Sequence, residues 1–395
     1  MRPTDLRTHN LAKLIRLIDE GLEPLSRASL AKSAQLTKPT VSKLVDELVA
    51  GGLVTEGAPE HDGRSGRPFT PLTISQGSHF GIATSFSADH LGIRLQDLAG
   101  NVAHEAYDYF PLRDVDSTLP RVISLLQGAL AYLPKGATVV GFIASIPGRI
   151  DSQEKYIISA PNLDWDDIPL GELIDSAVAR EIALPLPPVR LVNDARVVTA
   201  TELAARPGQS FVVLYGETGI GGTIVLDGKI LGGCEGWAGE IGHTIVDPNG
   251  PQCRCGNHGC LEAYASYWAL CKRASLPSDI PISALPEHLP PEVLEEVGYW
   301  IGVAVSNVLT FLDIHTVVFA GYLSTFYSYV KESIKETIAQ RTLDFPHRSI
   351  EMHPLKVNED ALLLGGCIEA LKPVFEQPNL WINGALGLSP KDGLT

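Results

Sequence analysis

The most informative segment of this chain is Cys253-Arg254-Cys255-Gly256-Asn257-His258-Gly259-Cys260. It is preceded by Gly242-His243. The histidine and the three cysteines fall within eighteen residues, and this spacing predicts one tetrahedral metal site. The Cys-x-Cys pair supplies two thiolates from one turn, and the two glycines let the backbone fold back so that Cys260 completes the site. An imidazole and three thiolates fill all four positions around Zn²⁺ and leave none for water. The segment therefore predicts a structural zinc site.

Two alternatives to this interpretation stay open in the sequence. One is a disulfide knot or a chance cluster, and the other is that His258 replaces His243 as the fourth ligand. Four of the six cysteines lie between Cys234 and Cys260, and the N-terminus lacks the hydrophobic core of a secretory leader, which favours reduced thiols and a metal. His243 is the favoured ligand because it lies close to the carboxylate of Glu240.

Length and composition indicate a globular protein of ordinary polarity. The chain has 395 residues, of which 45% are hydrophobic and 19% are charged, and this length suits two or three domains with sizeable cores. No apolar run approaches the length of a membrane span. We therefore expect a cytoplasmic protein without membrane contact.

Charge is distributed unevenly along the chain. Residues 1–75 contain ten Lys or Arg and nine Asp or Glu, a net charge of +1. Subtracting these from the totals of 31 and 46 leaves 21 basic and 37 acidic residues, a net charge of −16. This difference predicts an N-terminal domain over 1–75 that is distinct from the remainder, 76–395.

The N-terminal 75 residues predict a winged helix-turn-helix. Apolar residues recur at helical spacing over 11–18, and a second helix is expected to begin near Ser26. Thr37 is suited to cap a third helix, and Pro39 falls in its first turn, where a missing N–H does no harm. Gly51-Gly52 then ends this helix.

The third of these helices is the predicted DNA-reading element. Its apolar residues, from Val41 to Leu48, form one face, and the opposite face is polar and basic. This is the arrangement of a recognition helix in a major groove. The residues that we expect to contact DNA from this helix are Lys38, Pro39, Thr40, Ser42 and Lys43.

A wing is expected to follow, with strands at 53–56 and 69–74. The loop between them reads Asp62-Gly63-Arg64-Ser65-Gly66-Arg67-Pro68. A narrow cationic tip of this kind suits the insertion of Arg64 and Arg67 into a minor groove. The alternative is that both arginines lie in a solvated loop and that the helices form a small protein-docking domain.

A net charge of +1 is weak for DNA attachment, and the acidic remainder of the chain repels phosphates. Two copies on a palindromic operator would correct this weakness. We therefore expect a homodimer or homotetramer that is assembled by the C-terminal body.

From about His79 onward, strands alternate with helices. The first set comprises strands at 80–86, 91–97, 102–110 and 139–146 and a helix at 118–132. The second set comprises strands at 211–215, 222–226 and 317–320 and a long helix at 291–313. Two similar α/β halves with a cleft between them, divided near residue 195, are the simplest account.

Polar residues at strand ends predict a site for a polyol in this cleft. Gly148 closes one strand, Asn162 follows shortly after, and a further strand runs directly into Asn193-Asp194. Glu240 and Glu262 flank the cysteine segment. Each carboxylate accepts two hydrogen bonds, and an amide both donates and accepts, which is what vicinal hydroxyls need. The alternative is that these are ordinary surface residues.

His243 has a second predicted use. If one ring nitrogen binds zinc, the other is fixed as a donor toward the cleft, so the metal would aim a sugar contact.

These motifs together resemble the ROK family, named for repressors, open reading frames and kinases. The resemblance rests on Asn193-Asp194, Gly219-Ile220-Gly221-Gly222, Glu240-Ile241-Gly242-His243 and the run from Cys253 to Glu262. It covers nearly the whole chain, because residues 1–75 are similar to the winged helix of the family's repressors. The cysteine segment is highly specific, whereas the glycine run alone is weak.

The resemblance implies an actin-like, two-lobed sugar-kinase fold of the α/β class, preceded by the winged helix-turn-helix. It implies zinc on His243, Cys253, Cys255 and Cys260. It also implies a sugar held by Gly148, Asn162, Asn193, Asp194, Glu240, His243 and Glu262. In the family's kinases, the residue matching Asp194 acts as a base toward a sugar hydroxyl.

Three segments that hold ATP in the family's kinases are altered here. Residues 81–87, Gly-Ile-Ala-Thr-Ser-Phe-Ser, lack the acidic residue and the Gly-Gly-Thr loop. The second loop keeps part of its glycines but has Glu217 where a triphosphate would lie. The third has Ala320 and Tyr322 in place of glycines. The chain is therefore predicted to keep the cleft and to lack kinase activity.

We expect a sugar-responsive DNA-binding regulator, most simply a repressor of carbohydrate-metabolism genes. A sugar or sugar phosphate that closes the two lobes would release it from a palindromic operator. One alternative is an ATP-dependent, zinc-containing sugar kinase with an accessory DNA domain. Another is an interaction protein controlled by a sugar-transport component. The sequence leaves open the sugar, the operator, and the choice between repression and activation.

Overall fold

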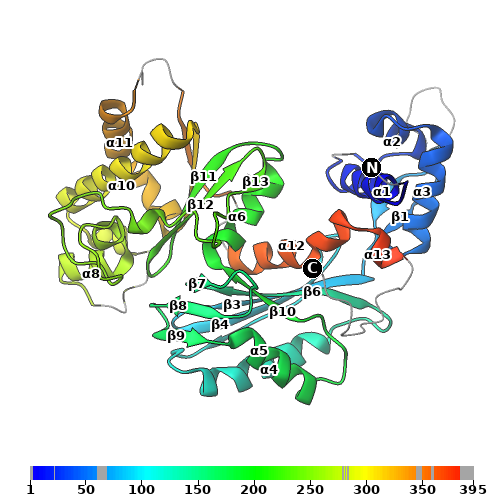
Figure 1. Cartoon of the computed structure of the whole chain (residues 1–395), viewed down its shortest axis with the longest axis horizontal. Coiled ribbons are helices and arrows are strands. Elements are labelled where there is room, and N and C mark those ends of the chain that lie inside the picture. The colour runs from blue at the N-terminus through cyan, green and yellow to red at the C-terminus, as the bar shows by residue number, and fades with distance from the viewer. Residues whose placement is uncertain are drawn as a thin grey trace.

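The computed structural model of the chain describes residues 3–21, 23–59, 69–277, 280, 282, 284–343, 349–356 and 360–382. Within these residues, a small N-terminal unit and two α/β lobes are arranged around one central helix (Figure 1). No helix in the described ranges has the length and apolarity that a bilayer crossing requires.

The N-terminal unit, here called the head, has the predicted winged-helix elements. They are α1 (Pro3–Asp19), α2 (Arg27–Ala34), α3 (Lys38–Ala50), β1 (Val54–Glu56) and β2 (Leu72–Ile74), with β1 antiparallel to β2. Ser26 caps α2 through a capping box with Ser29, and the Thr37 hydroxyl accepts the N–H of Thr40 at 3.4 Å at the start of α3. Both predicted helix starts are confirmed, because these caps satisfy backbone donors that the helices leave free.

The first lobe is built on a mixed five-stranded sheet in the order β10-β6-β3-β4-β5. Its strands are β3 (His79–Phe86), β4 (His90–Asp97), β5 (Val102–Tyr109), β6 (Thr138–Ile146) and β10 (Val189–Asn193). Helices α4 (Val115–Leu130) and α5 (Leu170–Glu181) cover one face of the sheet in Figure 1. A small sheet of β7 (Arg149–Ile150), β8 (Ile157–Ala160) and β9 (Trp165–Ile168) extends it.

The second lobe has a five-stranded sheet of its own, in the order β13-β12-β11-β14-β15. Its strands are β11 (Phe211–Gly216), β12 (Ile220–Leu226), β13 (Lys229–Ile230), β14 (Thr316–Gly321) and β15 (Glu351–Pro354). Its long helices are α10 (Pro291–Leu312) and α11 (Tyr322–Arg341). The shorter elements are η1 (Ile241–His243), α7 (Glu262–Ala265), α8 (Tyr267–Ala274) and α9 (Leu285–His288). The two predicted α/β halves are thus confirmed.

Helix α12 (Ala361–Glu376) joins these units. It contacts α6 (Asp194–Ala205), strands β3 and β6, and α1 of the head (Figure 1). A Cβ at Gly365 would lie 2.0 Å from the Val197 carbonyl oxygen, so glycine is required for α12 to approach α6 this closely. At its other end, Leu371 and Val374 share a hydrophobic cluster with the head, to which α13 (Asn379–Ile382) adds Ile382. One helix therefore touches both the head and the start of the second half.

The domain limits predicted at residues 75 and 195 stay predictions. The first falls between β2 and β3, and the second falls in the first turn of α6. Because α12 returns to the head, the C-terminal body and the head share a core across the first limit.

Candidate functional site

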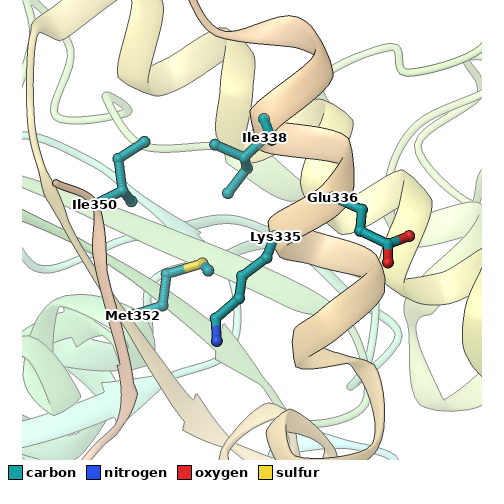
Figure 2. A pocket seen from close by; sticks show the side chains of 6 residues that line it. Lys335, Glu336, Ile338, Ile350 and Met352 are labelled. Atoms are coloured by element: carbon teal, nitrogen blue, oxygen red, sulfur yellow. The ribbon is translucent and has the colours of Figure 1, made fainter. Parts of the chain in front are cut away.

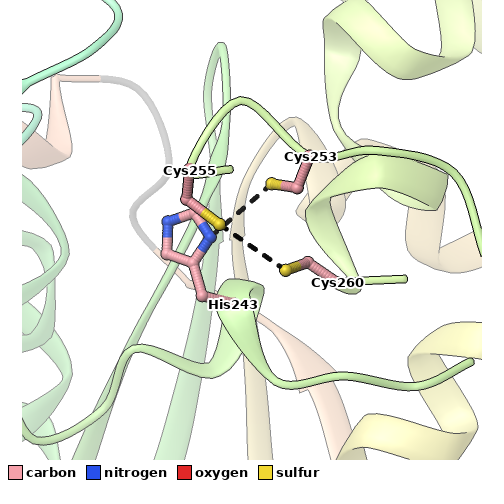
Figure 3. Close-up of side chains that lie close together, drawn as sticks. All are labelled: His243, Cys253, Cys255 and Cys260. Carbon is pink, nitrogen blue, oxygen red and sulfur yellow. Dashed lines mark hydrogen bonds between the residues drawn. The ribbon is translucent and has the colours of Figure 1, made fainter. Parts of the chain in front are cut away.

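The histidine and the three cysteines of the predicted zinc site lie together. One ligand atom from each of the four side chains falls within 4.8 Å of all the others. Cys253 Sγ lies 3.8 Å from His243 Nδ1, and Cys255 Sγ lies 3.7 Å from Cys260 Sγ (Figure 3). A tetrahedron with Zn–S bonds of about 2.3 Å has edges of about 3.8 Å, so these separations fit a zinc ion.

The alternatives to this ligand set find no support. All six cysteines lie in described ranges and are free of disulfide bonds. His258 is exposed and lies outside the four-residue cluster. Burial is the main cause that raises the pKa of the Cys260 thiol to about 11 and that of Cys253 further. A divalent cation supplies the positive charge that holds such buried thiols as thiolates, so the donor set fits zinc chemically as well.

The turn that brings the cysteines together depends on glycine. Gly259 has a φ of +73°, and a Cβ there would lie 1.6 Å from the Asp247 carbonyl oxygen. The Cys253 N–H donates to the Asn257 carbonyl at 2.8 Å, which closes the turn around Cys255. The chain can therefore fold back toward Cys260 only with glycine at this position.

Glu262 connects the cysteine cluster to the second lobe. Its Oε2 accepts the N–H of Ile220 at 3.0 Å, at the start of β12, and its Oε1 lies 3.8 Å from Cys253 Sγ. A Cβ at Gly219 would lie 2.4 Å from Glu262 Oε2 and 3.5 Å from Asn162 Nδ2. The absence of a side chain at Gly219 thus lets Asn162 and Glu262 approach the same point.

Asn193 and Asp194, two further predicted sugar residues, lie where strand β10 meets helix α6. Asn193 ends β10, where its Nδ2 donates to the Gly148 carbonyl at 3.0 Å and its Oδ1 accepts the N–H of Arg196 at 3.3 Å. The buried Asp194 begins α6, and its Oδ1 accepts the N–H of Ala195 at 2.7 Å. Helix start and strand end therefore hold both side chains at the junction of the two halves.

Electrostatics link Asp194 to the residues around the cluster. Burial, and then the negative charges of Glu217 and Glu240, raise the pKa of Asp194 well above its usual value. Partial loss of hydration raises the pKa of Glu240, against the effects of His243 and Arg149, and Glu262 raises it further. The structure thus brings the predicted sugar residues into one region, where their carboxylates and amides can share the hydroxyls of one small polyol.

The three segments that we predicted to be altered nucleotide loops make specific contacts. Ser87 Oγ donates to Glu217 Oε1 at 2.7 Å, and the Tyr215 hydroxyl donates to Glu217 Oε2 at 3.1 Å. A Cβ at Gly216 would lie 2.5 Å from the ring of Tyr322, whose hydroxyl donates to the Ala265 carbonyl. These contacts hold Glu217 and Tyr322 in place, and one residue from each segment, Ser85, Tyr215 and Gly321, lines a cavity between the lobes.

Two cavities are lined by residues other than the predicted sugar residues. One, of about 350 Å³, lies between the lobes and is lined by residues that include His90, Tyr107 and Asp360. The other, of about 340 Å³, lies between α11 and β15, where Ile338 faces Ile350 and Met352 (Figure 2). Neither lining includes a residue that we predicted to bind sugar.

The sequence interpretation missed a contact beside the sugar residues. The Arg149 guanidinium carbon lies 5.1 Å from the centroid of the Trp237 ring, which is within the range of a cation–π interaction. Only sequence position could have indicated this contact, because Arg149 follows Gly148 and Trp237 precedes Glu240 by three residues.

The structure describes the predicted DNA face of α3 but not the tip of the wing. Lys38, Pro39, Thr40 and Lys43 are exposed, whereas Ser42 is half-buried, and its carbonyl accepts a hydrogen bond from Arg27 at 3.0 Å. The apolar face of α3 is buried in the head as predicted. Arg64 and Arg67, at the tip of the wing, lie outside the described residues. The contacts of these side chains with DNA stay predictions.

A winged helix joined to a two-lobed α/β body with a His-Cys₃ cluster defines a class of DNA-binding proteins with a kinase-like body. The model of the ROK family matches residues 85–372, and the model of the MarR family matches residues 14–65. The chain therefore belongs to the ROK family, and it is a transcriptional regulator of that family with a MarR-type winged helix.

Individual relatives agree with this assignment. The xylose repressor of Bacillus subtilis (strain 168) is 27% identical over 354 residues, covering 87% of this chain and 90% of that protein. The DNA-binding transcriptional repressor Mlc of Escherichia coli (strain K12) is 29% identical over 276 residues, covering 69% and 66%. The crystal structure of a ROK family transcriptional regulator, a homolog of the E. coli MLC protein, has a TM-score of 0.77 at 24% identity and covers 95% of this chain and 98% of that one, which shows the shared fold.

Proposed function

We propose that this protein is a sugar-responsive transcriptional repressor of carbohydrate-metabolism genes, released from its operator by a small sugar ligand. The observation that carries the proposal is the position of Asp194. Its carboxylate lies among the predicted sugar residues, and its backbone begins α6, which contacts α12, the helix that reaches the head. A ligand at Asp194 is therefore one helix contact away from the element that holds the DNA-binding unit.

The cysteine cluster would hold one structural Zn²⁺ through His243, Cys253, Cys255 and Cys260. Zinc would supply a rigid cross-link rather than an open catalytic position, because the four donors complete its coordination. The cross-link would fix the loop that carries His243 and the start of the helix that carries Glu262. The chain's own side chains then orient the sugar hydroxyls.

Release from DNA would follow from lobe closure. A sugar that contacts Asn193 in the first half and Glu240 in the second gains more contacts when the lobes approach, so it favours the closed arrangement. Because α12 is closely packed against α6 at Gly365, movement of α6 is expected to move α12 and with it the head. The spacing of paired heads on a palindrome would change as a result.

The proposed repressor acts as a homodimer or homotetramer. The head carries a net charge of only +1, whereas the remainder of the chain carries −16, so a single copy gains little from phosphate contacts. Gel filtration at the concentration used for DNA binding should give a dimer or a larger species. A monomer under those conditions would contradict this part of the proposal.

The test is a titration of free and phosphorylated sugars into the full-length protein bound to DNA selected from a random pool. At least one sugar should weaken DNA binding, and Asp194→Asn should remove that response while DNA binding itself is retained. Asp116→Asn is the matched control, because Asp116 is exposed on α4 and outside this group of residues. No change of DNA affinity with any sugar would overturn the effector function.

Kinase activity is the second candidate, and the retained Asp194 is the observation that favours it. A kinase requires a phosphate donor beside this residue, where Glu217 is bound by Ser87 and Tyr215 instead. We expect no ATP-dependent phosphorylation of glucose, N-acetylglucosamine or N-acetylmannosamine. Turnover that disappears in Asp194→Asn would establish the kinase.

A further inference from the structure

Glu217 occupies the turn between β11 and β12 and binds across the two lobes. Its Oε1 accepts the hydroxyl of Ser87 at 2.7 Å, and Ser87 directly follows β3 of the first lobe. Its Oε2 accepts the hydroxyl of Tyr215, from its own lobe, at 3.1 Å. Both oxygens are therefore engaged, and the carboxylate is held in place where the lobes meet.

This carboxylate lies close enough to Asp194 to act on it. Glu217 is the charged group that does most to raise the pKa of Asp194, after burial itself. Strand β12 lies against the first turn of α6, because a Cβ at Gly221 would be 3.1 Å from that of Ala195. The two carboxylates thus face one region from opposite halves of the molecule.

Little positive charge offsets this pair. Within the described residues, neither Asp194 nor Glu217 has a Lys, Arg or His partner within 4.0 Å. His90 acts on Glu217 from a distance, but its Nδ1 is already 2.7 Å from the carboxylate of Asp89. Arg149 acts on Glu240 and lies over Trp237. The region suits neutral hydroxyls, which donate to carboxylates, and repels anions.

We propose that Glu217 selects the effector by charge, so that the sugar recognised beside Asp194 is uncharged and carries no phosphate. The inference rests on the proposed function and narrows its ligand. A phosphate carries a charge of about −1.5 to −2 at neutral pH. Burial raises the pKa of Glu217 as well as that of Asp194, and a phosphate placed here would either meet two negative charges or have to drive both pKa values higher still. Like-charge repulsion of this kind weakens binding.

The experiment compares each free sugar with its phosphate by calorimetry on the full-length wild-type protein. The probes are glucose, N-acetylglucosamine and xylose, with glucose 6-phosphate, N-acetylglucosamine 6-phosphate and xylose 5-phosphate. For any sugar that binds, the phosphate should bind at least about tenfold more weakly, because like charges repel strongly in a partly desolvated site. This comparison requires no variant and so does not depend on the folding of one.

Glu217→Gln tests the residue itself. Glutamine keeps the side-chain length and an oxygen that accepts from Ser87, and it removes the negative charge. The affinity for the free sugar should change little. The ratio of the affinity for the free sugar to that for its phosphate should fall by about tenfold. Glu235→Gln is the control, since Glu235 is exposed on the loop before Glu240, and it should leave both affinities as they are.

The outcomes separate the two claims. Tighter binding of a phosphorylated sugar overturns this inference and leaves the sugar-responsive repressor standing. If the ratio of the two affinities is the same in Glu217→Gln as in the wild type, Glu217 does not select the sugar by charge. Absence of binding by every sugar, free or phosphorylated, overturns the proposed function together with the inference.

Discussion

At the scale of single residues, Glu262 connects the cysteine cluster to the predicted sugar residues, which together are here called the sugar region. One of its oxygens accepts the N–H of Ile220 at 3.0 Å, and the other lies 3.8 Å from Cys253 Sγ. The Ile220 N–H fixes one oxygen, and Glu262 begins α7 only two residues after Cys260, so loss of the cluster is expected to shift the carboxylate. The three cysteine ligands are therefore expected to influence sugar binding without contact with the sugar.

Replacement of Cys255 by serine should reveal this dependence. Cys255→Ser removes one of four zinc donors, so we expect loss of bound zinc and a decrease in sugar affinity of about 10- to 100-fold. Assembly should also weaken, whereas the head should stay folded. Metal analysis, calorimetry and thermal unfolding measure these effects. Cys234→Ser is the control, because Cys234 is exposed and outside the cluster. If Cys255→Ser reduces sugar binding, assembly and head stability equally, the site supports the whole chain.

At the scale of elements, the contact between α6 and α12 is the tightest step between the sugar region and the head. Gly365→Ala places a methyl group against the Val197 carbonyl, where the two atoms would be 2.0 Å apart. We expect the free energy of unfolding to fall by about 1–3 kcal/mol, the usual effect of overpacking, and the DNA response to sugar to weaken. Urea denaturation and the operator titration measure the two effects.

A second glycine supplies the comparison for Gly365. Gly128 lies on the exposed side of α4 with no atom within 4 Å of an added Cβ. Gly128→Ala should therefore raise the free energy of unfolding by about 0.4–1 kcal/mol through its helix propensity. If both substitutions change the free energy of unfolding in the same direction, close packing at Gly365 is not the cause of its effect.

The recognition helix allows a test of the predicted DNA contacts. Lys43 is exposed on α3, opposite the buried apolar face. Lys43→Ala should weaken DNA binding, and loss of one phosphate contact should reduce the slope of log affinity against log salt by about 1. Lys135→Ala removes an exposed lysine from the first lobe and should leave that slope unchanged. An unaltered slope in Lys43→Ala would mean that Lys43 makes no phosphate contact.

Elements with a local signal were predictable from the sequence, and contacts between distant elements were not. The caps at Ser26 and Thr37 and the alternating strand patterns mark helix starts and strands within a few residues. The cluster at 243–260 was predictable because its spacing reflects coordination geometry. By contrast, the Ser87–Glu217 hydrogen bond joins residues 130 positions apart, and neither residue type indicates its partner. The packing of α12 on α6 depends on close backbone approach at Gly365, and its packing on the head depends on Leu371 and Val374, and one sequence reveals neither contact.

At the scale of the whole molecule, the sugar region and the head are linked through α6 and α12, and the charge of the chain is divided between them. The head has a net charge of +1 and the remainder −16, so we expect DNA affinity to depend on how the heads are held rather than on overall attraction. In the proposed dimer or tetramer, a ligand that changes the position of α12 would therefore act on the spacing and orientation of the paired heads.

Thermodynamic linkage turns this arrangement into a reciprocal prediction. If the effector sugar lowers DNA affinity by a given factor, operator DNA must lower sugar affinity by the same factor, typically about 5- to 150-fold. Calorimetric titration of sugar into the free protein and into the protein–operator complex measures the second factor, and DNA titrations with and without sugar measure the first. Gly365→Ala should reduce both factors together, because each is carried through the same contact between α6 and α12. A sugar affinity that is indifferent to DNA, in a protein whose DNA affinity responds to sugar, would mean that the observed release does not arise from linked binding to one protein.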